Sequence, residues 1–116
     1  MPAACKQGEI WMADLNPHFG TEIGKVWPVV IVQTDLLNGE HPSTIICPIS
    51  TNVQPGADIL RVHLNKKNSG LEKKSDILAD QIRTIDNCRL KRRVGKITTE
   101  SLSRLLENLR VILDIG

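Results

Sequence analysis

Aromatic residues are scarce in this chain of 116 residues, which has two tryptophans, one phenylalanine and no tyrosine. RNA-binding modules that read a base sequence stack bases on exposed aromatic side chains, so this composition argues against such modules. Long apolar runs are also absent. The longest, Val29 to Val32, is far too short to span a bilayer, and the N-terminus lacks the apolar stretch of a signal peptide. We therefore expect a cytoplasmic protein with no membrane partner.

Cysteine is not arranged as a disulfide framework or a zinc site requires. Cys5, Cys47 and Cys88 are widely spaced, with no Cys-x-x-Cys pair, and such a set suits reduced thiols. The histidines are scattered in the same way, at positions His18, His41 and His63. A metal site could therefore form only by assembly in three dimensions, and we expect the protein to need no metal and no cofactor.

Charge is unevenly distributed, although the net charge is only +2. Residues 1–60 carry two lysines against six acidic residues, whereas residues 61–116 carry thirteen lysines and arginines against seven acidic residues. The densest basic stretch, residues 89–96, contains no acid: Arg89, Lys91, Arg92, Arg93 and Lys96. Two interpretations stay open, namely a solvated face or a surface that attracts a polyanion or an acidic protein.

The length and the 41% hydrophobic content predict a single domain, residues 1–116, with one core. Alternating apolar residues and turn signals predict six strands, at 8–14, 28–33, 44–50, 59–64, 76–84 and 94–97. The pattern of 76–84 alone also allows a helix. Pro48 predicts a bulge or a sheet edge in the third strand, because proline cannot donate a ladder hydrogen bond.

The C-terminal region predicts an amphipathic helix that is capped by Thr98 or Thr99 and ends near Asp114. Its apolar stripe follows the spacing i, i+3, i+4, i+7 and consists of Leu102, Leu105, Leu106, Leu109, Ile112 and Leu113. Short strands followed by one such helix predict an α+β, mainly β fold: a small, strongly bent antiparallel sheet or barrel with the helix packed on it.

Several motifs occur in a familiar order over residues 8–113. They are Gly8-Glu-Ile-Trp-x-x-Asp14-Leu-Asn-Pro17, Gly20-Thr-Glu22-x-Gly24, Pro28-Val-Val-Ile-Val, Cys47-Pro-Ile-Ser50-Thr51 and Leu78-Ala-Asp80-Gln81-Ile-Arg-Thr-Ile-Asp86. In this order and spacing the chain resembles the MazF/PemK toxins of type II toxin–antitoxin systems. The resemblance implies an SH3-like small barrel of the CcdB/MazF type, a homodimer and a cognate antitoxin whose acidic C-terminal segment blocks the RNA site.

The same resemblance implies an activity: metal-independent, sequence-selective cleavage of single-stranded RNA. The neighbouring 2′-hydroxyl attacks the phosphate, leaving a 2′,3′-cyclic phosphate and a 5′-hydroxyl. The family uses a hydroxyl at the end of the third strand, which maps to Ser50 with Thr51 adjacent, and in some members a loop acid, which maps to Glu22. Without the resemblance, a hydroxyl at a strand end more often bonds to the backbone.

Further candidates follow for binding RNA: Asn16, His18, Lys25, Gln81 and Arg83. A lone loop histidine such as His18 is more often simply solvated. Asp80 and Gln81 fall where the family keeps a polar pair near its dimer face, and a strand-end hydrogen-bond network is an equal alternative for them.

Trp27 departs from the family pattern, which has arginine directly before the proline that opens the second strand. Indole offers one neutral donor, whereas guanidinium offers five donors and a permanent charge that suits phosphate. Lys25 and Arg83 are the candidate substitutes. Either they carry the chemistry, or the chain is attenuated.

Two rival functions stay open at this point. The first is a non-enzymatic toxin on the same barrel that inhibits a protein partner such as a topoisomerase, as the CcdB toxins do. The second is a catalytically dead homologue that titrates antitoxin, which the substitution at Trp27 favours.

Overall fold

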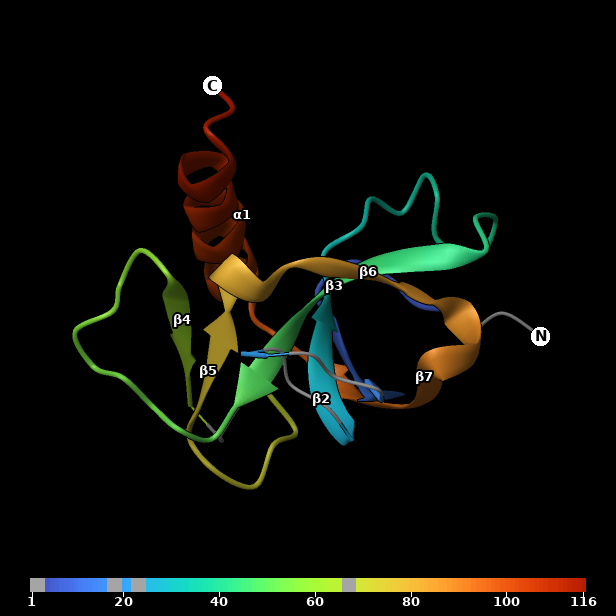
Figure 1. Ribbon diagram of the computed structural model, residues 1–116, viewed down its shortest axis with the longest axis horizontal. Coiled ribbons are helices and arrows are strands. Elements are labelled where there is room, and N and C mark those ends of the chain that lie inside the picture. The colour runs from blue at the N-terminus through green and yellow to red at the C-terminus, as the bar shows by residue number, and fades with distance from the viewer. Residues whose placement is uncertain (1–3, 17–19, 22–24, 66–68) are drawn as a thin grey trace.

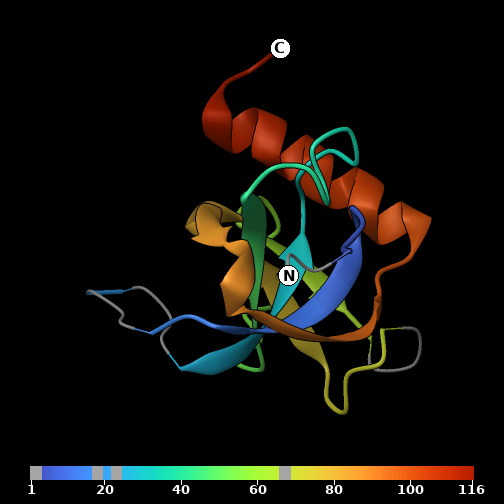
Figure 2. The ribbon, with the colours of Figure 1, turned by 90° about the vertical axis from the view of Figure 1, so that its right-hand side faces the viewer.

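The computed structural model describes residues 4–16, 20–21, 25–65 and 69–116. Its seven strands form one antiparallel sheet in the order β4-β5-β3-β2-β1-β7, and β6 pairs with β3 outside this path. The strands curve around one another, and one helix lies along their side (Figures 1 and 2). The strands are β1 (Glu9–Asp14), β2 (Val26–Ile31), β3 (Ser43–Ser50), β4 (Arg61–Leu64), β5 (Ser75–Leu78), β6 (Arg83–Asp86) and β7 (Leu90–Lys96). The predicted mainly β fold with a C-terminal helix is confirmed.

The helix α1 (Thr99–Leu113) begins and ends as its sequence predicts. The Thr98 hydroxyl accepts a hydrogen bond from the Ser101 amide at 3.1 Å, and so satisfies one of the free donors of the first turn. Leu105 and Leu109 are buried against the sheet. Leu113 is half exposed, so it does not belong to the predicted apolar stripe. No helix of the described residues is long and apolar enough to cross a membrane.

Strand β2 is buried on both of its faces, which explains its uninterrupted apolar run. Val30 packs into a cluster that includes the buried leucines of α1. Val29 and Ile31 point the other way, into a second cluster with Ala13, Leu15, Ile46, Ile85 and Leu90, against which Trp11 and Trp27 pack. Successive residues of a strand face opposite sides, so this one strand joins two apolar layers.

Two close backbone contacts bring the loop after β4 against β7, the strand at the opposite end of the sheet path. A Cβ on Gly95 would lie 2.4 Å from the Ser69 carbonyl oxygen, and one on Gly70 would lie 2.7 Å from the Val94 carbonyl oxygen. Only glycine permits this approach, and Gly70 also has a φ of +79°. The curved sheet therefore approaches a closed, barrel-like form.

The structure corrects the single strand predicted at 76–84. It consists of β5 and β6, which are separated by a 3₁₀ helix, η2 (Ala79–Gln81). The break arises because the two strands pair with different parts of β3: β6 pairs with residues 43–46 and β5 with residues 49–50. Pro48 lies between these two sets, so its missing N–H costs no pairing there. The predicted bulge or edge at Pro48 is in fact this change of neighbour.

The other predicted strands differ at their ends. The second strand begins at Val26, not Pro28, because Val26 and Trp27 pair with β1. The fourth begins at Arg61, because residues 58–60 form a turn. The last strand begins at Leu90, since the basic stretch pairs with β1 along most of its length. Another 3₁₀ helix, η3 (Asn87–Arg89), precedes it.

Gly95→Ala should destabilise the fold, because its methyl group would collide with the Ser69 carbonyl oxygen. We expect the free energy of unfolding to fall by about 1–3 kcal/mol, the usual cost of overpacking. Urea unfolding followed by circular dichroism measures the change. Gly56→Ala is the matched control, since a Cβ there meets nothing within 4 Å, and it should change stability by less than about 1 kcal/mol. Equal losses of stability in both variants would contradict the close contact that brings the curved sheet near to a barrel.

Candidate active site

Trp27 lies near the start of β2, where it pairs with Ala13 of β1. Its indole N–H donates a hydrogen bond to the Ile49 carbonyl oxygen, and its ring packs against the second apolar cluster. Trp27 therefore joins the start of β2 to the end of β3. Because indole has a single donor and this donor is engaged within the protein, Trp27 presents no hydrogen bond to a phosphate.

Ser50 is the last residue of β3 and lies beside Trp27. The register pairs Val29 with Pro48, so two residues further along it brings Trp27 next to Ser50. The Ser50 hydroxyl oxygen accepts a hydrogen bond from the Asn52 amide at 3.0 Å. Its own proton is not required by that bond and can be donated elsewhere. Thr51 is exposed in the turn that follows.

Lys25 and Asn16 fix the chain just before Trp27. The Lys25 amide donates to the Asn16 side-chain oxygen at 2.6 Å, and the Lys25 carbonyl accepts from the Leu15 amide at 2.8 Å. Lys25 has a φ of 66°, and its side chain is exposed. The Arg89 guanidinium donates to the carbonyl oxygens of Asp14 and Asn16 and so attaches this segment to η3. Lys25 and Asn16 therefore lie at the same strand end as Trp27.

The other predicted RNA-binding residues are less close to Ser50. Gln81 donates from its side-chain amide to the Thr21 carbonyl at 3.3 Å, and Asp80 is exposed. Arg83 pairs with Ile46, four residues before Ser50 on β3, or about 13 Å along the strand. His18 and Glu22 lie outside the described residues.

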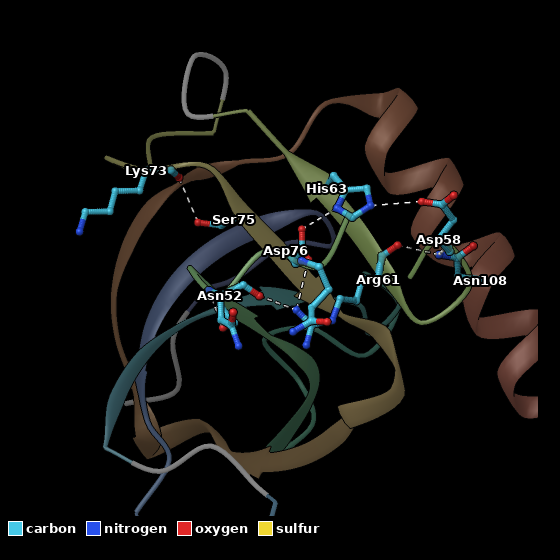
Figure 3. Close-up of polar contacts among 10 residues, drawn as sticks. Asn52, Asp58, Arg61, His63, Lys73, Ser75, Asp76 and Asn108 are labelled. Carbon is cyan, nitrogen blue, oxygen red and sulfur yellow. Dashed lines mark hydrogen bonds and ion pairs between the residues drawn. The ribbon is translucent and has the colours of Figure 1, made fainter. Parts of the chain in front are cut away.

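A buried acidic residue, which sequence reasoning missed, lies on the other side of Ser50. Asp76 of β5 pairs directly with Ser50 and is completely buried. Its carboxylate accepts from the Gln54 amide at 2.8 Å and from the Arg61 guanidinium at 3.2 Å, and lies 2.6 Å from His63 Nδ1. Figure 3 shows Asp76 between Arg61 and His63. An acid directly before the apolar residues 77–79, together with two basic residues spaced i, i+2 on β4, is the sequence signal for this cluster.

The same cluster holds the loop that follows Ser50, residues 51–58. Arg61 also donates to the Asn52 carbonyl oxygen at 2.6 Å, and His63 Nε2 lies 3.2 Å from the Asp58 carboxylate. The Asn108 side-chain amide, on α1, donates to the Asp58 carbonyl oxygen at 3.0 Å (Figure 3). The loop is therefore attached to β4 at its start, to β5 in its middle, and to both β4 and α1 at its end.

Charges within the cluster shift two pKa values in opposite directions. Burial alone would raise the pKa of the Asp76 carboxyl, but hydrogen bonds from Gln54, His63 and Arg61 outweigh it and lower that pKa. The hydrogen bond to Asp76 raises the pKa of His63 against the smaller effect of burial, and Asp58 raises it further. The α1 residues Glu100 and Arg104 line the same pocket as His63. A protonated imidazole can donate to both carboxylates, whereas a neutral one can donate to only one.

This arrangement brings together the Ser50 hydroxyl and, through Asn52, the Arg61 guanidinium at one end of β3, and both groups can stabilise negative charge. His63 cannot act as a base for Ser50, because Asp76 lies between them in the sheet. Among the described residues, no group of three or more His, Cys, Asp or Glu side chains is placed to hold a metal ion.

Comparisons with known proteins identify the relatives of this chain. Residues 6–113 match the family model described as PemK-like, MazF-like toxin of type II toxin-antitoxin system. The sequence is 35% identical over 108 residues to Endoribonuclease EndoA of Bacillus subtilis, which covers 93% of each chain.

Solved structures show the same fold. MazF from Deinococcus radiodurans is similar with a TM-score of 0.84 at 19% identity, over 97% of this chain and 99% of that one. A mycobacterial endoribonuclease in complex with its cognate antitoxin is similar with a TM-score of 0.76 at 18% identity, over 97% and 96%.

His63→Gln should lower stability in a pH-dependent manner. Because the pKa of His63 is raised in the folded state, its contribution is fully present below the unfolded pKa and is lost as the pH rises through the folded pKa. The difference in the free energy of unfolding between the native chain and the variant, measured with urea, should therefore be larger at about pH 6 than at about pH 9. A difference that is the same at both pH values would show that the imidazolium does not contribute.

Proposed function

Because this chain belongs to the PemK-like, MazF-like toxin family of type II toxin–antitoxin systems, we propose that it is a metal-independent, sequence-selective endoribonuclease that cuts single-stranded RNA. The observation that carries the proposal is the meeting of Trp27 and Ser50 at one strand end, where the family pattern has its arginine and its hydroxyl. Attack by the neighbouring 2′-hydroxyl would leave a 2′,3′-cyclic phosphate and a 5′-hydroxyl.

Ser50 stabilises the negative charge that builds on the phosphate oxygens in this proposal. Its oxygen accepts from the Asn52 amide, so its proton is free to point at a phosphate oxygen. Thr51, exposed at the next position, is a second hydroxyl within the same turn. Glu22 is the proposed loop acid, and Asn16, His18, Lys25, Gln81 and Arg83 are proposed to bind the RNA strand.

Trp27 attenuates the reaction in this proposal. Its indole has no charge and directs its only donor at Ile49, and the loss of one transition-state donor typically lowers a rate by ~10²–10³. Because the indole N–H is already bonded, a second candidate function is also favoured, namely a catalytically dead homologue that titrates antitoxin. The rate of RNA cleavage by the native chain, compared with that of its variants, decides between an attenuated and an inactive enzyme.

A cognate antitoxin and a second copy of the chain are the proposed protein partners. A mycobacterial relative is solved with its cognate antitoxin, and exposed Arg92 on β7 offers a positive surface to an acidic segment. Arg93 is less free, because it forms an ion pair with Glu9 at 2.8 Å. Exposed apolar side chains, such as Val111 and Leu113 on α1, are consistent with a further protein surface covering part of the chain. We propose that this assembly acts in the cytoplasm.

Single-stranded RNA incubated with the protein in excess EDTA should be cut, because the proposed chemistry uses only protein groups. The products should carry 2′,3′-cyclic phosphate and 5′-hydroxyl ends, which mass spectrometry identifies. Addition of the cognate antitoxin should stop the reaction. Cleavage that disappears with chelator and returns with magnesium would contradict the mechanism.

Trp27→Arg should raise the rate of RNA cleavage at least about tenfold, which corresponds to about 1.4 kcal/mol of barrier. The guanidinium would supply a charge and a fork of donors where indole supplies neither. Single-turnover cleavage of labelled RNA measures the gain. Ser50→Ala in the same background should abolish the gain, and Thr51→Ala should reduce it less. An unchanged rate in Trp27→Arg would mean that another cation already fills this role.

A further inference from the structure

The proposed RNA site requires a cation near Ser50, and among the described residues no hydrogen bond connects Lys25 or Arg83 to Ser50. Arg83 lies opposite Ile46, about 13 Å along β3 from Ser50. Lys25 lies two residues before Trp27, and its backbone bonds to Asn16 and Leu15, which follow β1. A different arginine, on the side of Ser50 opposite to Trp27, is connected to Ser50 by hydrogen bonds.

Arg61 of β4 is connected to Ser50 through a single residue. Its guanidinium Nη1 donates to the Asn52 carbonyl oxygen at 2.6 Å, and the Asn52 amide donates to the Ser50 hydroxyl oxygen at 3.0 Å. A second connection runs through Asp76, which accepts from the same Nη1 at 3.2 Å and pairs with Ser50 across the sheet. Figure 3 shows the Arg61 head between Asn52 and Asp76.

The protein engages only one nitrogen of the Arg61 head among the described residues. Within the described part of the chain, the only buried side-chain nitrogen or oxygen without a hydrogen-bond partner is Nη1 of Arg83. Nε and Nη2 of Arg61 make no hydrogen bond to the described residues, and the side chain is 19% exposed. One nitrogen is therefore fixed by the protein, while the other two have no partner in the described part of the chain.

We propose that Arg61 is a catalytic residue that contacts the scissile phosphate from the side of Ser50 opposite to Trp27, and that Asp76 is the positioning residue that holds it there. This inference rests on the proposed endoribonuclease function. Guanidinium retains donors after one nitrogen is anchored, which suits it to bind a phosphate while it remains ion-paired. Since Asp76 offsets part of the charge, the contribution of Arg61 comes mainly from directed donors.

Cleavage rates test the catalytic contact. Arg61→Gln should lower kcat at least about tenfold with a smaller change in KM, because the donors act mostly on the transition state. In the Trp27→Arg background the same substitution should cost clearly less, since a second guanidinium then meets the phosphate. A merely structural role would give equal losses in both backgrounds and would overturn the proposal. Arg110→Gln, an exposed helix position paired with Glu107, is the matched control and should leave the rate unchanged.

Folding of the variants must be separated from catalysis. Arg61→Gln leaves the buried Asp76 carboxylate with one partner fewer, which can destabilise the chain. The double variant Arg61→Gln/Asp76→Asn removes both charges and keeps a possible amide–amide hydrogen bond. If it folds by circular dichroism, it should show the same loss of kcat as Arg61→Gln. A folded double variant with native kcat would overturn the proposal.

Binding to RNA that cannot be cut separates this inference from the proposed function. We use single-stranded 2′-O-methyl RNA of mixed sequence, which lacks the attacking hydroxyl. If Arg61 contacts a phosphate, Arg61→Gln should reduce the slope of log affinity against log salt by about 0.7, the value for one contact on a single strand. An unchanged slope would overturn the Arg61 contact. Absence of cleavage by both the native chain and Trp27→Arg, with the slope reduced, would contradict the endoribonuclease but not the phosphate contact.

Discussion

Strand β3 is paired on both sides, and its change of neighbour at Pro48 determines where the candidate site lies. On one side it pairs with β2, and on the other it pairs first with β6 and then with β5. Its last residue, Ser50, is therefore flanked by Trp27 of β2 and Asp76 of β5. The chain leaves the sheet directly after Ser50, in a loop that the Asp76 cluster fixes. A single strand thus places a hydroxyl between an indole and a buried carboxylate.

Local signals in the sequence were sufficient for much of the fold. The cap and the apolar stripe of α1 depend on residues within a few positions of each other. The sequence therefore predicts the helix and narrows its cap to Thr98 or Thr99, of which the structure has Thr98, while Leu113 lies outside the buried stripe. The split of 76–84 into two strands was not predictable in the same way. It depends on pairing with two parts of β3 that lie 26 to 43 residues earlier in the chain. Alternation within a segment carries no information about its partner.

The candidate site, like the fold, has features that the sequence predicts and features that depend on tertiary contacts. The absence of arginine at position 27 and the hydroxyl at Ser50 are visible in the sequence, because each is a matter of residue identity. The engagement of the Trp27 indole by Ile49 and the convergence of Gln54, Arg61 and His63 on Asp76 are matters of tertiary contact. An acid in a short, fully buried strand indicates that a partner must exist, since a buried carboxylate is costly without one. It does not identify the partner.

The position of Trp27 at the rim of the second apolar cluster has a genetic consequence. Because the ring is only half buried, a long side chain at this position can lay its methylene groups over the cluster and extend its head into water. The tryptophan codon, UGG, differs from two arginine codons, CGG and AGG, by one base. A gene that encodes Trp27 is therefore one point mutation away from the arginine of the family pattern. If Trp27 attenuates cleavage as proposed, that single mutation would restore the activity that the proposed antitoxin has to neutralise.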